Sequence, residues 1–369
     1  MSKEKLSFIR LLFLILNTIA VLGLISAYLA NFLNPATYFF AALSGLFYPY
    51  MLAVNGFFVV FWLFRKWKYA LFSLVTILIG VDSLHRFYQF SGEDIPSGND
   101  SLVKVLSYNV QVFGIYSDKN NKQDILDFLE KEQPDIACFQ EYCQNNKPEN
   151  NISTASQIEK AIDANSHYLY LPLSRGKYQF GMAIFSRFPI INKGNIVFND
   201  AKANHAMYAD MLIENDTVRV YNIHFQSIHF GAEDYLFARQ ATSNAEMSNS
   251  KWKQNSMRIL RKIKSGFAKR TEQVNAVVEH IKSSPHRVII CGDFNDTPWS
   301  YTYRQIRNLS EDSFIESGKG TGYTFIIRKL LAFRIDYIFH DKSFKSYQYT
   351  TTAIHASDHY PIHTCLQIK

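Results

Sequence analysis

The chain has 369 residues, and its charged residues are unevenly distributed. Residues 1–99 hold seven of the 39 basic and four of the 32 acidic side chains, so the remaining residues carry a net charge of only +4. That excess is too small to indicate a nucleic-acid partner by itself, and the four cysteines show neither a disulfide framework nor the spacing of a zinc site.

The N-terminal part of the chain is strongly apolar. No Asp, Glu, Lys or Arg occurs in residues 11–64. Residues 11–33 and 37–64 are each long enough to cross the hydrocarbon core of a bilayer. Residues 69–81 form a third, shorter run that spans only if its aromatic flanks lie at the membrane interface. These runs predict a membrane anchor over residues 1–90 with two or three transmembrane helices.

Two other interpretations fit the first apolar run less well. A cleaved signal peptide would have a shorter apolar core and a small-residue cleavage site. A buried hairpin of a soluble protein would have to cover 54 consecutive uncharged residues. We therefore expect a lipid bilayer to surround this part of the chain.

Basic residues indicate how the anchor is oriented. They flank the start of the first run and the end of the second: Lys3, Lys5, Arg10, Arg65, Lys66 and Lys68. Because basic loops tend to stay in the cytoplasm, both of these ends are expected there. If the third run spans, the rest of the chain lies outside the cytoplasm; if it does not, the rest is cytoplasmic. We expect the outside of a bacterial-type inner membrane.

A polar segment over residues 91–100 links the anchor to a part with ordinary globular composition. Strand-like runs alternate with helical patterns there, which predicts a layered α/β domain over residues 101–369. The predicted strands cover residues 103–108, 135–140, 181–186, 218–224, 287–291, 335–339 and 363–368. The predicted helices cover residues 123–131 and 271–282.

Many of the predicted strands end at a polar residue of a type that is used in catalysis. The segments are LSYN at Asn109, CFQE at Glu141, VYNIH at His224, GDFN at Asp293 and Asn295, RID at Asp336, and SDH at Asp358 and His359. Loops at strand ends commonly build active sites. We therefore expect these eight side chains to form one site, and carboxylate and amide oxygens there would suit Mg²⁺.

These segments, in this order, resemble the endonuclease/exonuclease/phosphatase family. The resemblance covers about residues 102–367, and its most specific part is GDFN with a later SDH and an earlier Asn and Gln-Glu. It implies a four-layer α/β sandwich, in which two packed mixed sheets are flanked by helices. It also implies hydrolysis of phosphodiester bonds by a divalent cation, Mg²⁺ or Mn²⁺, and an activated water.

The resemblance also implies a metal site built from oxygen ligands. Glu141 matches the family's principal ligand, and Asn109 and Asp358 match positions that complete the metal's surroundings. Some family members carry an acidic residue two positions after Asn109, where this chain has Gln111. That departure puts a second ligand at this position in doubt and counts against the abasic-site endonuclease branch.

The remaining residues match the family's catalytic positions. By this resemblance, Asp293 activates or aligns the water, and Asn295 holds a phosphate oxygen. His359 hydrogen-bonds the phosphate, and Asp336 fixes the tautomer of His359. His224 matches a histidine of the deoxyribonuclease and sphingomyelinase branches, where it assists the leaving group or the phosphate.

Two substrate classes stay open, and a third interpretation assigns no reaction. Residues 251–270 hold eight basic and no acidic side chains; they suit a nucleic acid, anionic lipid or a solvated helix face. The anchor suits a phospholipid or small phosphoester. A catalytically idle binding module would have lost Glu141, Asp293 or His359, and the chain retains all three. We expect a nuclease, with the lipid or small-phosphoester enzyme as the alternative.

Overall fold

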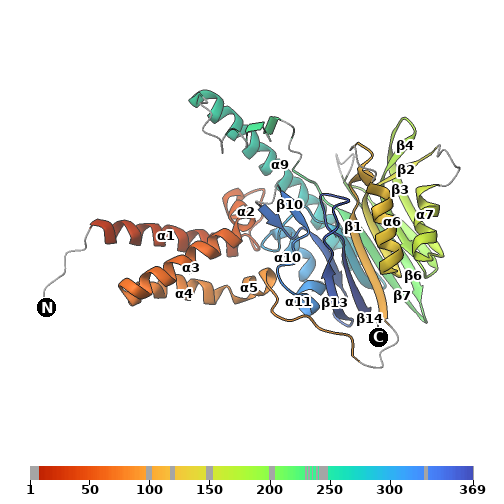
Figure 1. Cartoon of the computed structure of the whole chain (residues 1–369), viewed down its shortest axis with the longest axis horizontal. Helices are drawn as coiled ribbons and strands as arrows, with labels where there is room; N and C mark the ends of the chain where they lie inside the picture. Colours follow the sequence, from red (N-terminus) through yellow and green to blue (C-terminus); the bar gives the residue numbers. More distant parts are fainter. Residues whose placement is uncertain are drawn as a thin grey trace.

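The molecule has a helical bundle at one end and a β-sandwich at the other (Figure 1). This computed structural model describes residues 8–96, 102–116, 121–146, 153–198, 204–228, 248–327 and 331–368, with a few positions between 231 and 240. Lys3 and Lys5, which entered the topology prediction, lie outside the described residues, as do residues 97–100 of the polar segment.

The N-terminal bundle contains both of the long apolar helices. α1 and α3 are long and apolar enough to cross a membrane, and α4 with α5 makes a third candidate that is bent by 67°. The bundle is built from α1 (Phe8–Leu29), α2 (Phe39–Leu46), α3 (Tyr48–Arg65), α4 (Trp67–Ile79) and α5 (Val81–Phe87).

The second apolar run differs from the prediction, because residues 37–64 form two helices instead of one. Phe47 separates α2 from α3 with backbone angles outside the helical range (φ −101°, ψ 15°). Pro49 then occupies the first turn of α3. Proline is tolerated there but would break a continuous helix, since it lacks an N–H and clashes with the preceding turn.

The bundle buries a group of polar side chains among its apolar ones and exposes apolar side chains on its outside. Ser73 Oγ lies 2.8 Å from Asn17 Oδ1 and 2.9 Å from Asn55 Oδ1, and all three residues are buried. Large apolar side chains such as Leu22 and Ile79 are exposed on the outer faces. This arrangement suits a lipid environment, where the apolar surface faces the acyl chains and polar groups pair between helices.

The sandwich contains two six-stranded sheets and a separate β10–β11 hairpin. The first sheet has the order β13-β14-β1-β2-β4-β3, and the second has the order β5-β6-β7-β8-β12-β9. The strands are β1 (Leu102–Asn109), β2 (Ile136–Asn145), β3 (Ser166–Arg175), β4 (Tyr178–Ser186), β5 (Ile190–Ile196), β6 (His205–Ile213), β7 (Asp216–His224), β8 (Arg287–Asp293), β9 (Glu311–Asp312), β10 (Phe325–Ile327), β11 (Leu331–Phe333), β12 (Asp336–His340), β13 (Lys345–Thr351) and β14 (Ile362–Gln367).

Helices cover the outer faces of both sheets. Apolar residues of the two inner faces, among them Val105, Val220 and Ile289, form the core between the sheets. α6 and α7 pack on the first sheet and α9 and α10 on the second (Figure 1). The predicted four-layer α/β sandwich is confirmed. The helical elements are η1 (Gln111–Gly114), α6 (Asn121–Glu132), α7 (Thr154–Ile162), α9 (Asn249–Lys282), α10 (Tyr301–Arg307) and α11 (Ser313–Ser317).

The bundle packs directly on the sandwich. The Trp299 ring stacks on Tyr48 with the ring centroids 4.2 Å apart, and its Nε1 donates to the Ser83 carbonyl at 3.2 Å. Arg86 Nη1 donates to the Pro298 carbonyl at 3.1 Å. The bundle therefore contacts the segment that immediately follows the GDFN motif.

Candidate active site

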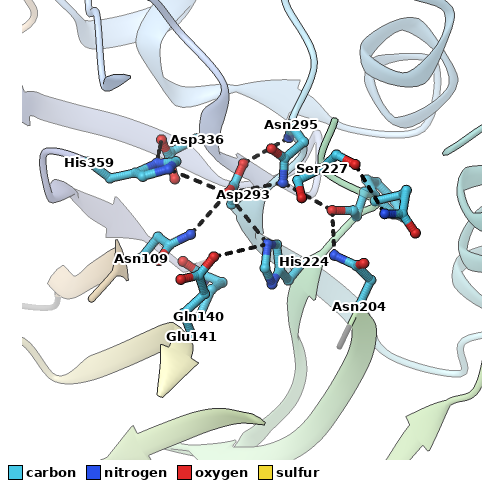
Figure 2. A network of polar contacts seen from close by, with 12 residues as sticks. Asn109, Gln140, Glu141, Asn204, His224, Ser227, Asp293, Asn295, Asp336 and His359 are labelled. Atoms are coloured by element: carbon cyan, nitrogen blue, oxygen red, sulfur yellow. Dashed lines mark hydrogen bonds and ion pairs between the residues drawn. The ribbon is translucent and has the colours of Figure 1, made fainter. Parts of the chain in front are cut away.

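Three of the predicted site residues meet because their strands are neighbours. β7 and β8 run parallel with His224 opposite Asp293, and β12 runs antiparallel to β8 with Asp336 opposite Asp293. The three side chains therefore lie at the same edge of the second sheet (Figure 2). This edge is where loops from several strands converge.

Gly292 allows the close approach of strands β7 and β8. Its φ is +149°, and a Cβ at this position would lie 2.0 Å from the Ile223 carbonyl oxygen. Only glycine fits such a conformation and such a distance. The GD pair of the motif thus sets the position of Asp293 beside His224.

Asp293 is the centre of the hydrogen-bond network. Its carboxylate accepts bonds from the Asn295 backbone N–H at 2.8 Å, Asn109 Nδ2 at 3.0 Å and Asn295 Nδ2 at 3.2 Å. Asn295 has a positive φ of +52°, and its Nδ2 also donates to the Phe225 carbonyl at 3.0 Å. Burial, reinforced by the nearby Asp336, raises the pKa of Asp293 to about 6.

Asp336 and His359 form a buried pair beside Asp293. The Asp336 Oδ2 and His359 Nδ1 atoms are 2.9 Å apart, so the His359 Nε2 atom faces the site and lies 3.7 Å from Asp293 Oδ2. Burial disfavours the charged imidazolium, but the carboxylates of Asp336 and Asp293 outweigh this effect and raise the pKa of His359 to about 10. His359 is therefore positively charged at neutral pH.

Glu141 reaches the site from the first sheet. The pairing of β2 with β4 is irregular between Phe139 and Tyr142, and Glu141 has a φ of +49° there. A bulge of this kind redirects a side chain at a sheet edge. The Glu141 side chain is 39% exposed, and its Oε1 lies 3.9 Å from His224 Nε2. Glu141 thus lies at the solvent side of the buried network.

His224 is buried between two carboxylates. Its Nε2 lies 3.7 Å from Asp293 Oδ2 and has no hydrogen-bond partner among the described residues. Burial lowers the pKa of His224. A neutral imidazole with an unbonded nitrogen is available to a ligand that enters the site.

The donor atoms of this site suit a hard divalent cation. Oxygens of Glu141, Asp293 and Asn109 line the edge, and one buried oxygen of Asp336 has no hydrogen-bond partner among the described residues. Ligand atoms of Asp293, Asp336 and His359 lie within 4.8 Å of one another. Asp336 already bonds His359, whereas the half-exposed Glu141 side chain reaches solvent.

The structure brings seven of the eight predicted side chains together (Figure 2). The eighth, Asp358, is exposed, and its Oδ1 accepts from Ser357 Oγ at 3.3 Å within the same turn. Ser357 also donates to the Asn109 carbonyl at 2.8 Å, which fixes the SDH turn to the end of β1. The roles of all eight residues stay predictions.

Two amides under the site were not predicted from the sequence. Gln140 Nε2 donates to Asn222 Oδ1 at 2.6 Å, and Asn222 Nδ2 donates to the Phe139 and Ala183 carbonyls at 2.9 Å. This bridge joins the two sheets directly beneath Glu141 and His224. The available signal was an amide inside each of two otherwise apolar strands, since a buried amide requires partners.

Two different family models match the two parts of the chain. The model of the endonuclease/exonuclease/phosphatase family matches residues 106–359, and the model of a domain of unknown function matches residues 10–87. None of the curated proteins matches the chain.

Solved structures share the fold at low sequence identity. A humanized TDP2 from D. rerio is 15% identical, with 73% of this chain and 100% of that chain covered and a TM-score of 0.50. A family protein from Leptotrichia buccalis is 18% identical, with coverage of 72% and 100% and a TM-score of 0.51. An endonuclease/exonuclease/phosphatase from Beutenbergia cavernae is 14% identical, with coverage of 73% and 72% and a TM-score of 0.51.

The family match includes strands of both sheets and every residue of the network around Asp293. The family hydrolyses phosphoester bonds and depends on a divalent metal, and a buried cluster of acidic and histidine side chains lies within the matched residues of this chain. The chain belongs to the endonuclease/exonuclease/phosphatase family.

Proposed function

We propose that the chain hydrolyses phosphodiester bonds with a divalent cation, Mg²⁺ or Mn²⁺, and an activated water. The observation that carries this proposal is a buried cluster in which Asp336 bonds His359 and the His359 Nε2 atom lies 3.7 Å from Asp293 Oδ2. The half-exposed Glu141 lies at the solvent side of this cluster. Glu141 and Asn109 would hold the cation, and Asp358, which lies on the turn that Ser357 bonds to Asn109, would complete its surroundings. When bound, the cation would offset the negative charge that the phosphate develops in the transition state.

Asp293 and Asn295 are suited to position the water and the phosphate. Three N–H donors orient the Asp293 carboxylate, and its raised pKa of about 6 lets it accept a proton near neutral pH. The Asn295 amide lies beside it and would donate to a phosphate oxygen.

The two histidines are suited to different tasks. His359 carries a proton at neutral pH and would donate it in a hydrogen bond to a phosphate oxygen, while Asp336 holds the other ring nitrogen. His224, whose pKa is lowered by burial, would stay neutral and donate a hydrogen bond from a ring N–H to the leaving-group oxygen or the phosphate. This separation of charge states follows from their different neighbours.

A nucleic acid is the substrate that we place first. Five basic residues of α9 are exposed and have no acidic partner among the described residues: Lys251, Lys253, Arg261, Lys264 and Lys269. α9 reaches the site edge, where Gln273 Oε1 accepts from the Gln226 backbone N–H at 2.8 Å. Such a concentration of positive charge on one helix suits a phosphate backbone.

A membrane phospholipid is the second candidate. It is favoured by the packing of Tyr48 and Arg86 against Trp299 and Pro298, which fixes the bundle close to the GDFN loop. An anchor held in this way keeps the site at a constant orientation to the bilayer, as an enzyme acting on lipid headgroups would require.

The experiment compares substrates on the full chain in lipid nanodiscs, because the bundle covers Trp299. Single-stranded DNA, duplex DNA, RNA, sphingomyelin and inositol phosphates are assayed with Mg²⁺, with Mn²⁺ and with EDTA. We expect metal-dependent cleavage of nucleic acid, weakened when Lys251, Lys253, Arg261 and Lys264 are replaced by Gln. Turnover of lipid or inositol phosphates alone would favour the second candidate. No turnover of any substrate by folded protein would contradict the proposal.

We also infer that the bundle crosses the membrane three times. The described basic residues Arg65, Lys66 and Lys68 lie at the end of the bundle far from the sandwich, which is also where α1 begins (Figure 1). Because basic ends favour the cytoplasm, this arrangement supports a sandwich outside it. Residues 1–90 would be the anchor, residues 91–100 a linker and residues 101–369 the catalytic domain.

A further inference from the structure

A basic cavity lies where the bundle meets the sandwich. Its volume is about 280 Å³, and it is bounded by α5, α10 and the turn after β12. Four of its six lining residues are basic: Arg86, Arg304, Arg307 and Lys342, with Asn308 and Glu311. A cavity of this size and charge has room for a phosphate group and its substituents.

Two of the basic groups share one carboxylate within the protein, so one of their two positive charges is left over. Arg86 pairs with Asp82 through Nη2, and Arg307 Nη1 lies 3.0 Å from Asp82 Oδ1. Arg304 has no hydrogen bond or ion pair from its guanidinium among the described residues, and Lys342 donates only to the Asn308 carbonyl at 3.2 Å. Arg304 and Lys342 therefore supply unneutralised positive charge.

The position of Arg304 also favours an anionic ligand. Partial burial, together with the nearby charges of Arg86 and Arg307, lowers the pKa of Arg304. Arg86 is almost fully buried, and its Nε has no hydrogen-bond partner among the described residues. Positive charges crowded in this way repel one another, and an anion between them would relieve the repulsion.

Apolar membrane-facing surface adjoins the cavity. The Arg304 guanidinium lies 4.0 Å from the centroid of the Phe32 ring. Phe32 is 60% exposed and lies three residues beyond the end of α1. Ile79 and Val81, at the junction of α4 and α5, are also exposed, next to Asp82 of the arginine cluster. A ligand that joins a phosphate to long acyl chains would match both surfaces.

We propose that this cavity binds the phosphate headgroup of an anionic phospholipid, with the acyl chains lying along the outer faces of α1 and α4. Basic pockets beside transmembrane helices bind anionic lipid headgroups in this manner. The inference rests on the proposal that the bundle spans a membrane, but it does not depend on the proposed hydrolysis.

The cavity is separate from the candidate active site. Asp336 begins β12 at the site edge, whereas Lys342 follows the opposite end of that strand. A lipid headgroup bound in this cavity therefore does not reach the candidate active site around Asp293. It would hold the bundle and the sandwich together through α5 and α10.

The test measures lipid binding by the full chain in detergent, by native mass spectrometry. Phosphatidylglycerol and phosphatidylcholine are titrated against the wild type and the double variant Arg304→Gln/Lys342→Gln. The matched control is Arg175→Gln/Lys177→Gln, which removes the same charges from the exposed β3–β4 turn. We expect the wild type and the control to prefer phosphatidylglycerol, and the cavity variant to bind it at least tenfold more weakly.

Three results would overturn the inference. The first is that the cavity variant and the wild type bind phosphatidylglycerol with equal affinity. The second is that the wild type binds the two lipids with equal affinity. The third is that glycerol phosphate binds as tightly as phosphatidylglycerol. The last result would identify a soluble phosphate as the ligand. An Asp293→Asn variant should bind phosphatidylglycerol as tightly as the wild type does. Lipid binding and hydrolysis are therefore measured independently, and failure of one proposal is distinguishable from failure of the other.

Discussion

The carboxylate of Asp336 determines which way His359 faces. It lies 2.9 Å from Nδ1. The backbone of Asp336 is held by Thr324, whose Oγ1 accepts from the Asp336 N–H at 3.2 Å. The pair keeps the His359 Nε2 atom turned toward Asp293. Asp336 is therefore a positioning residue, and its effect should be visible in the charge state of His359.

We predict that Asp336→Asn lowers turnover by about 10²–10⁴-fold, as loss of an orienting carboxylate does in comparable pairs. The amide no longer stabilises the imidazolium, so the pKa of His359 falls from about 10. The alkaline limb of the pH–rate profile should then move to lower pH. A variant with reduced turnover but an unchanged profile would show that Asp336 has only a structural role.

A second prediction concerns stability at a histidine away from the site. His363 lies on β14 with its Nε2 3.6 Å from Glu132 Oε2, and burial, with the charge of Lys104, lowers its pKa to about 4. An unfolded histidine titrates near pH 6.5, so the unfolded state binds more protons between these values. The contribution of the neutral His363 to the free energy of unfolding is therefore fully present above pH 6.5 and is lost as the pH falls toward 4.

His363→Gln should remove this loss, which amounts to roughly 1–3 kcal/mol. The measurement is the thermal midpoint of the full chain in detergent and EDTA between pH 4 and pH 8. The exposed His355→Gln variant serves as the control. Parallel curves for His363→Gln and the wild type would contradict the prediction.

At the residue scale, the sequence predicted the site residues that belong to motifs, including the amides Asn109 and Asn295, and missed two amides beneath them. GDFN and SDH are specific enough to place Asp293 and His359, because few combinations of residues serve the same chemistry. Gln140 and Asn222 form no motif, and their partners lie on the opposite sheet. Their contact depends on how the two sheets pack, which a strand pattern alone does not give.

At the scale of elements, α9 shows how far a charge pattern can be interpreted. Of its basic residues, Arg258 and Lys262 pair with the buried Asp234, and Arg270 is buried beside Asp296. The segment predicted as a helix, residues 271–282, is only the end of a helix that begins at Asn249. Part of its charge is therefore structural, and only the exposed residues are available to a ligand.

Other elements were missed because their patterns are weak. β5 and β6 pair over most of their length, yet β5 is largely exposed and contains lysine, asparagine and glycine. The position of such a strand is set by its neighbours in the sheet more than by its own residues. The separation of α2 from α3 likewise depends on the backbone at Phe47.

The contact of α2 with the sandwich leads to a third prediction. A Cβ at Gly45 would lie 2.5 Å from the Trp299 carbonyl oxygen and 2.9 Å from the Ala30 Cβ. Gly45→Ala should therefore separate α2 from the sandwich and lower the free energy of unfolding by about 1–3 kcal/mol. The thermal midpoint of the full chain in detergent measures this effect.

Gly56 provides the matched control within α3. A Cβ there has no atom within 4 Å, and alanine is favoured over glycine in a helix by about 1 kcal/mol. Gly56→Ala should therefore leave the midpoint unchanged or raise it. Equal destabilisation by the two substitutions would contradict the packing described for Gly45.

At the scale of the whole molecule, the proposed three spans put the two ends of the bundle on opposite sides of a membrane. Lys68 is exposed near the start of α4, and Arg175 is exposed on the sandwich. We predict that Arg175→Cys reacts with a membrane-impermeant maleimide in intact cells, whereas Lys68→Cys reacts only after the membrane is opened. The native cysteines Cys138, Cys143 and Cys291 are buried, and Cys365 is replaced by Ser. The reverse pattern would place the sandwich in the cytoplasm.

The central claim is that the network around Asp293 is a metal-dependent phosphodiesterase site, and one assay tests it most directly. Hydrolysis of a chromogenic phosphodiester by the full chain is measured with Mg²⁺ and with EDTA, for the wild type, Asp293→Asn and the exposed control Asp163→Asn. We predict turnover by the wild type and the control with Mg²⁺ and background turnover in EDTA. Folded Asp293→Asn should lose at least about 10³-fold in turnover. Turnover that persists in EDTA, or that Asp293→Asn retains in full, would contradict it.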